Sequence, residues 1–214
     1  MPESYDREKL NQTKTGTTTV GLLCKDGIVL VADKQSTAFY VASREEKKLH
    51  KITDRIGMTI AGSVADNQYL IRLLRAESSL FRMQRQRDLS VRGLATLLSN
   101  IMHSMRIYPY LALIIVGGYD STGAHLYSVD PLGGLSTGEK FTGSGSGSPI
   151  ALGVLEADYK ENMSVDSGIK LAIKALKAAR ARDVYTGGNY LDIAVITKDG
   201  YKELPRDQIK KLLK

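Results

Sequence analysis

Cysteine and long apolar runs are nearly absent from this sequence. Cys24 is the single cysteine among 214 residues, which excludes a disulfide framework within the chain and favours a reducing compartment. Cys24 lies in the apolar run 20–24, so a packing role is favoured over catalysis. No apolar run approaches the length of a membrane span, and the N-terminal residues carry charges where a signal peptide would be apolar. We therefore expect a cytoplasmic protein that makes no contact with a membrane.

Histidine is also scarce, and none of His50, His103 and His125 has a partner at metal-ligand spacing. The sequence lacks zinc-finger spacing and glycine-rich phosphate loops. The formal net charge of +7 keeps a basic nucleic-acid-binding protein as an alternative. The basic residues of 82–87 and 174–182 recur at helical spacing beside apolar positions, however, which favours solvated helix faces. We expect no metal, no cofactor and no nucleic acid.

The pattern of the chain indicates one domain that contains both strands and helices. Apolar and β-branched runs predict strands over 17–24, 28–33, 56–61, 111–118, 124–129 and 190–197, and apolar residues at helical spacing predict helices from 63 and from 90 onward, over 166–181 and over 204–214. Asp26 and Gly27 between the first two runs indicate a hairpin. Ser90 is typical of a helix N-cap. The run 143–149 fits either a flexible loop or a helix start. Strand pairs that alternate with helices predict an α+β fold, with antiparallel sheets covered by helices on the outside.

The candidate nucleophile lies where Gly16 directly precedes three threonines, after a polar leader. If the chain is cut after Gly16, Thr17 gains a free α-amine beside its hydroxyl. A hydroxyl is a weak nucleophile at neutral pH, and an α-amine with a pKa of about 7.7–8.0 can accept its proton. While Gly16 is attached, the nitrogen is an amide without basicity, so the leader would keep Thr17 inactive. The start of an ordinary strand is the alternative that these residues alone leave open.

Further motifs follow Thr17 in a fixed order. They are GTTTVG at 16–21, VADK at 31–34, KKL at 47–49, MTIAGS at 58–63, GSGSP at 145–149 and RD with TGG over 182–188. Together they resemble the β-subunit of the 20S proteasome, most closely its archaeal form, over essentially all of the chain after the leader. The resemblance implies the four-layer αββα sandwich of the N-terminal nucleophile hydrolases. It also implies a propeptide at 1–16, a catalytic domain at 17–214, and a threonine-type endopeptidase activated by self-cleavage between Gly16 and Thr17.

The resemblance implies a catalytic set that consists of Thr17, Asp33, Lys48, Gly62, Ser146, Asp183 and Thr186. Lys48, paired with Asp33, would lower the pKa of the Thr17 hydroxyl and relay protons. The Gly62 N–H would face the oxyanion, and the remaining members would orient the amine. From the residues alone, a solvated strand end at Asp33 and an exposed loop at Lys48 stay open.

The sequence departs from the family pattern at two positions. Thr186 stands where serine is usual, which keeps the hydroxyl, and Gln35 stands where arginine is common. The chain is also one residue shorter than the family between Asp33 and Lys48.

The resemblance also assigns substrate contacts. Ser36, Ile60 and Val64 match positions that line the S1 pocket, which receives the side chain before the cleaved bond, and Thr37 matches one that pairs with substrate backbone. A neutral, apolar pocket would favour cleavage after hydrophobic residues.

The family implies partners as well. Its β-subunits form stacked heptameric rings between two rings of α-subunits, and an ATPase cap delivers unfolded polypeptides. We expect a homo-heptameric β-ring here. An inactive structural β-subunit and an N-terminal nucleophile amidase acting on small amides are the alternatives, and the presence of the catalytic set argues against the first.

Overall fold

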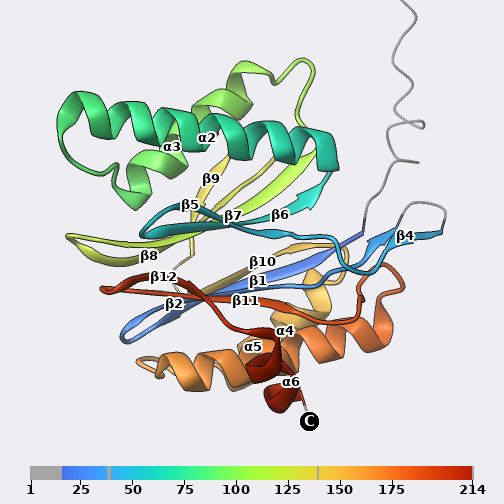
Figure 1. Cartoon of the computed structure of the whole chain (residues 1–214). Helices are drawn as coiled ribbons and strands as arrows, with labels where there is room; N and C mark the ends of the chain where they lie inside the picture. The colour runs from blue at the N-terminus through green and yellow to red at the C-terminus, as the bar shows by residue number, and fades with distance from the viewer. Residues whose placement is uncertain (1–15, 38–39, 139, 214) are drawn as a thin grey trace, which may run out of the picture.

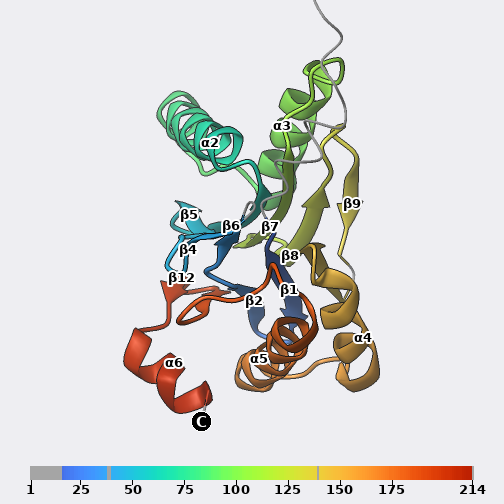
Figure 2. The ribbon, with the colours of Figure 1, turned by 90° about the vertical axis from the view of Figure 1, so that its right-hand side faces the viewer.

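The computed structural model describes residues 16–37, 40–138 and 140–213. Two five-stranded sheets lie face to face, and helices cover the outer face of each (Figure 1). Figure 2 shows the same layers from the side. The predicted α+β class and the order helix, sheet, sheet, helix are therefore confirmed.

The first sheet carries the N-terminal hairpin at its centre. Its strands in spatial order are β10 (Phe141–Gly145), β1 (Thr18–Cys24), β2 (Gly27–Ala32), β11 (Asp192–Thr197) and β12 (Gly200–Glu203), all paired antiparallel. Thr19 lies opposite Ala32, so the predicted hairpin is confirmed. Every residue of β2 is buried, because one face packs on the second sheet and the other on a helix.

The second sheet is an antiparallel meander. Its strands are β5 (Leu49–Thr53), β6 (Ile56–Gly62), β7 (Ala112–Asp120), β8 (Gly123–Val129) and β9 (Leu135–Thr137). A separate ribbon pairs β3 (Ser36–Thr37) with β4 (Val41–Ser43). The predictions did not include β3, β4, β5, β9, β10 or β12.

The helices begin where capping side chains are available. Helices α2 (Val64–Arg85) and α3 (Val91–Ser104) cover the second sheet, while α4 (Ser148–Asp158), α5 (Val165–Arg182) and α6 (Arg206–Leu213) lie on the side of the first (Figure 1). Ser90 accepts a hydrogen bond from the backbone N–H of Gly93 at 3.0 Å, which confirms the predicted N-cap. The run 143–149 is divided, since β10 ends at Gly145 and α4 begins at Ser148.

The core has an inner part between the sheets and an outer part under each helix layer. Ile28, Leu30, Ile115 and Leu126 fill the space between the sheets, while Val29 packs on the opposite face toward α5. Among the described residues no helix is long and apolar enough to cross a membrane. The packed sheets hold the strand ends that build the site.

Candidate active site

The ends of several strands meet around Thr17, which directly precedes β1. Asp33, just beyond β2, donates its backbone N–H to the Thr18 carbonyl at 3.1 Å. Gly145 at the end of β10 lies opposite Thr18, and Gly62 at the end of β6 lines a cavity with Thr17. Thr17 itself is buried. The junction therefore brings segments that are distant in sequence to one buried threonine.

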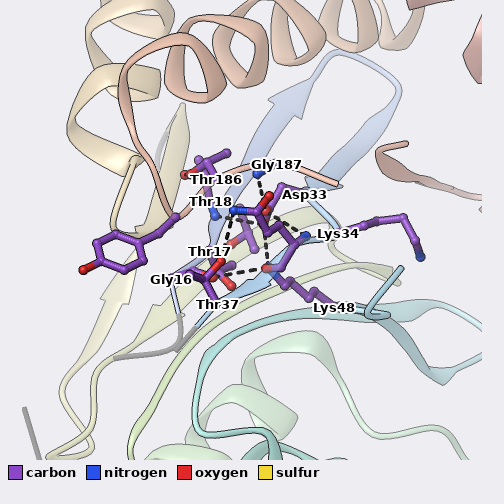
Figure 3. Close-up of polar contacts among 12 residues, drawn as sticks. Gly16, Thr17, Thr18, Asp33, Lys34, Thr37, Lys48, Thr186 and Gly187 are labelled. Carbon is purple, nitrogen blue, oxygen red and sulfur yellow. Dashed lines mark hydrogen bonds and ion pairs between the residues drawn. The ribbon is translucent and has the colours of Figure 1, made fainter. Parts of the chain in front are cut away.

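Asp33 and Lys48 form an ion pair beside the Gly16 carbonyl. The Lys48 Nζ lies 2.7 Å from Asp33 Oδ1 and 3.5 Å from the Gly16 oxygen, and it also donates to the Gln35 carbonyl. Asp33 Oδ1 accepts the Thr18 N–H at 3.0 Å, and Oδ2 accepts the N–H groups of Gln35 at 3.1 Å and Gly187 at 2.9 Å. Figure 3 shows these groups converging on the carboxylate. The network fixes both carboxylate oxygens.

Burial dominates the electrostatics of this pair. The Asp33 side chain is 0% exposed and that of Lys48 is 5% exposed, so a solvated strand end and an exposed loop are both wrong here. Burial lowers the pKa of Lys48 from its ordinary value, and the Asp33 carboxylate opposes this. Burial raises the pKa of Asp33, while Lys48 and the N–H donors oppose it. A lysine whose pKa is lowered exchanges protons more readily at neutral pH.

Hydroxyl groups form a second network on the other side of Thr17. The backbone nitrogen of Thr17 lies 3.3 Å from Ser146 Oγ. Ser146 donates to Asp183 Oδ2 at 2.7 Å, and Thr186 Oγ1 donates to the same oxygen. Thr186 and Thr18 share a hydrogen bond of 2.6 Å between their hydroxyls. The structure thus brings Ser146, Asp183 and Thr186 together, and Ser146 is the member that contacts Thr17.

Gly62 and most of the predicted pocket residues line one narrow cavity with Thr17. Its walls also include Ser36, Ile60 and Val64. Gly62 has a φ of +107°, and a Cβ there would lie 2.1 Å from the Leu111 carbonyl oxygen, so glycine is required. Thr37 does not line the cavity, and its Oγ1 instead accepts a hydrogen bond from Gln35 Nε2 at 3.0 Å.

The comparison with known families decides the assignment. The family model described as "Proteasome subunit" matches residues 13–196. The chain belongs to the proteasome subunit family. Among relatives of this proteasome chain, proteasome subunit beta of Methanocaldococcus vulcanius is 54% identical over 203 residues, which cover 94% of this chain and 91% of that protein. That of Methanocaldococcus jannaschii is 54% identical over 92% of this chain and 89% of its own, and that of Ferroglobus placidus is 46% identical over 92% and 94%.

The predicted family and class of activity are therefore confirmed. This proteasome chain is a β-subunit of the core particle, which it builds with other subunits, and a threonine peptidase of the N-terminal nucleophile hydrolase type. Within the described ranges of the chain, no three histidine, cysteine or acidic side chains gather as metal ligands would.

Gln35 and Thr186, which depart from the pattern of the proteasome family, are both buried in the site. Gln35 bridges two segments, since its Nε2 contacts Thr37 and also donates to the Val184 carbonyl at 3.1 Å. It adds no charge beside Lys48, whereas an arginine would. Thr186 keeps the hydroxyl that a serine would supply, and its methyl group fits into the buried site.

The sequence reasoning missed residues that support this proteasome site. Thr18 and Gly187 hold the Asp33 carboxylate through their backbone N–H groups, and both lie inside the quoted motifs without an assigned role. Glu46 and Asn67 line the cavity beside Thr17. Glu46 adjoins the KKL motif, but nothing in the sequence distinguishes Asn67 from any polar residue in the first turn of a helix.

Proposed function

We propose that this β-subunit is an endopeptidase whose nucleophile is Thr17, unmasked when the chain cleaves itself after Gly16. The observation that carries the proposal is the position of the bond between Gly16 and Thr17. Lys48 lies 3.5 Å from its carbonyl oxygen and Ser146 Oγ lies 3.3 Å from its nitrogen. The rest of the predicted propeptide, residues 1–15, lies outside the described residues.

Self-cleavage would transfer the Gly16 acyl group from nitrogen to oxygen. Thr17 Oγ1 attacks the Gly16 carbonyl carbon, an oxygen–carbon bond forms, and the carbon–nitrogen bond breaks as the nitrogen receives the hydroxyl proton. Water then hydrolyses the ester, which leaves a carboxylate on Gly16 and a free amine and hydroxyl on Thr17. The Lys48 ammonium stabilises negative charge on the carbonyl oxygen during the attack.

Cleavage of a substrate would use the same groups with the amine as base. The free amine of Thr17 accepts the proton of Oγ1, the oxygen attacks the peptide carbonyl, and the amine returns the proton to the leaving nitrogen. The Gly62 N–H faces the oxyanion, and a donor of this kind contributes about 2.7–4 kcal/mol. Ser146, held by the Asp183 carboxylate to which Thr186 also donates, orients the amine. Water hydrolyses the acyl ester on Thr17.

We propose that the assembly follows the family pattern. Homo-heptameric β-rings would stack between α-subunit rings, with an ATPase that supplies unfolded polypeptides to a closed cytoplasmic chamber. The support is the similarity to relatives named proteasome subunit beta over most of the chain. Electron microscopy of the co-expressed subunits and fractionation of the cell test these points.

The intact mass of the subunit after co-assembly with a proteasome α-subunit tests the central proposal. Wild type should lose residues 1–16, and Thr17→Ala should keep them and cleave no peptide, because the variant lacks the nucleophilic hydroxyl. If both stay full length in assembled particles, an inactive structural subunit is the better description. If both are cut, an outside protease removes the leader and self-cleavage is wrong.

A further inference from the structure

Two hydrogen-bonded networks lie on either side of Thr17. The Lys48 network consists of the ion pair between Lys48 and Asp33, and the Asp183 network consists of the Asp183 carboxylate and the two hydroxyls that donate to it. In the view of Figure 3, Thr186 of the second network lies above Asp33, and Lys48 lies below it. The proposed function needs both networks, since the first acts on the carbonyl under attack and the second orients the amine of Thr17. Their relative position therefore matters for catalysis.

Gln35 contacts the Lys48 network through its main chain. Its N–H donates to Asp33 Oδ2 at 3.1 Å, and its carbonyl oxygen accepts a hydrogen bond from Lys48 Nζ. Both side chains of the ion pair are buried, so water does not compete for these two bonds. Every residue type except proline has the same main-chain donor and acceptor. The attachment of residue 35 to the ion pair therefore does not depend on the glutamine side chain.

The Gln35 side chain extends to the loop that carries the Asp183 network. Its Nε2 donates to the Val184 carbonyl oxygen at 3.1 Å and to Thr37 Oγ1 at 3.0 Å. Val184 directly follows Asp183, in the loop that leads from α5 to Thr186. The Val184 side chain is 77% exposed, so its packing does little to hold the loop. Gln35 is 6% exposed and therefore anchors the main chain of this loop from a buried position.

The amide of Gln35 has one orientation available. A backbone carbonyl only accepts hydrogen bonds, so Nε2 and not Oε1 must face Val184. Gly187 closes the space on the oxygen side, since an added Cβ there would lie 2.3 Å from Oε1. The two protons of Nε2 are then both donated, one to Val184 and one to Thr37. A buried amide that is fixed in this way links the two networks at a defined separation.

We propose that Gln35 is a positioning residue that couples the Lys48 network to the Asp183 network. Its main chain is attached to the ion pair, and its side chain fixes the main chain beside Asp183. The hydroxyl and the amine of Thr17 then stay aligned with each other and with the carbonyl under attack. Because glutamine is neutral, it makes this link without a further charge beside Lys48. The inference rests on the proposed function, since it assigns a role within that site.

The variant Gln35→Met tests the proposal in the particle assembled with an α-subunit. Methionine has a stem of similar length without a donor, and the main-chain contacts remain. The kcat for a fluorogenic peptide should fall about five- to tenfold, the rate equivalent of one buried neutral hydrogen bond. KM should change by less than about twofold, because the Asp183 network acts on the amine and not on substrate binding.

The matched control is Gln86→Met at the end of α2. Gln86 Nε2 also donates to a backbone carbonyl, that of Met83 at 2.9 Å, but this glutamine is exposed. The control should keep the kinetics of wild type. A double-mutant cycle then identifies the route. In a Thr186→Val particle, where the Asp183 network is already weakened, Gln35→Met should cost less than it does alone, because residues that act as a unit have non-additive effects.

Each other outcome overturns the inference. A higher KM at unchanged kcat would mean that Gln35 acts on substrate binding through Thr37, and additive losses in the cycle would separate it from the Asp183 network. If Gln35→Met does not assemble, Gln35→Leu repeats the test, and failure of both would make Gln35 a folding residue only. Wild-type kinetics in Gln35→Met, with the leader removed, refute this inference alone. If wild type itself keeps the leader and cuts no peptide, the proposed function fails.

Discussion

Replacement of Lys48 by methionine should destabilise the subunit and inactivate it. The change leaves the Asp33 carboxylate, which is 0% exposed, with the N–H groups of Thr18, Gln35 and Gly187 as its remaining donors. Removal of one partner from a buried ion pair costs about 3–5 kcal/mol. The N–H donors still stabilise the carboxylate, so we expect about 3 kcal/mol. At about 2–4 °C per kcal/mol for a chain of this size, Tm should fall by about 6–12 °C.

The neighbouring lysine supplies the control for this prediction. Lys47→Met makes the same chemical change at a side chain that is 50% exposed and lies 2.9 Å from Glu203. An exposed pair contributes about 0–1 kcal/mol, so Tm should change by a few degrees at most. Lys47→Met should keep its peptidase activity, whereas Lys48→Met should lose about 10²–10³-fold or more in kcat/KM, because the positive charge near the reacting carbonyl is gone.

The pH dependence of the stability that Lys48→Met loses provides a second test. Burial raises the pKa of Asp33, and loss of the Lys48 charge raises it further, so the folded variant binds a proton at higher pH than the unfolded chain. The loss of stability is therefore full above the folded pKa of Asp33 and shrinks as the pH falls through it. Thermal unfolding at several pH values measures the fall in Tm and its pH dependence. Intact mass and peptide cleavage measure the loss of activity. Equal Tm changes in the two variants, or full activity in Lys48→Met, would refute the reasoning.

Other positions give shorter predictions. Gly16→Ala should slow removal of the leader, because an added Cβ would lie 1.8 Å from the Tyr185 Cβ; wild-type processing by intact mass would contradict this. Thr186→Val should cost about 1–3 kcal/mol and lower activity, because it removes a buried hydroxyl that bonds Thr18 and Asp183, while Thr186→Ser should stay near wild type in both unfolding and peptide assays. Burial lowers the pKa of His50 from 6.5 to about 4, so stability should fall as the pH drops through that interval, where only the unfolded chain binds the proton. Acid unfolding of His50→Gln should lack this component, and identical curves would argue against the burial.

The elements that the sequence predicted are those with strong local signals. Strands β1, β2, β6 and β7 are long apolar runs, and α2 and α3 follow serine caps. Strand β5, with the sequence LHKIT, mixes charged and apolar residues and was missed, because its place at the sheet edge is set by pairing with β6. Strands β3 and β9 are too short for any periodicity to appear.

The sequence by itself was enough to propose the chemistry of Thr17 and to predict its first partner. A nucleophile and a potential base belong to one residue by covalent connection, and the hairpin returns Asp33 to the start of β1 only 15 positions after Thr18. Such contacts are local, so residue pattern is enough to predict them.

Only the tertiary structure decided the rest of the site. Ser146 reaches Thr17 across 129 positions of sequence, and Asn67 joins the wall of the cavity beside Thr17 from the first turn of α2. The raised and lowered pKa values of Asp33 and Lys48 follow from burial. Burial and long-range contact arise when the two sheets and their helices pack together, because no single segment of chain can exclude water from a charge or place a distant side chain beside it.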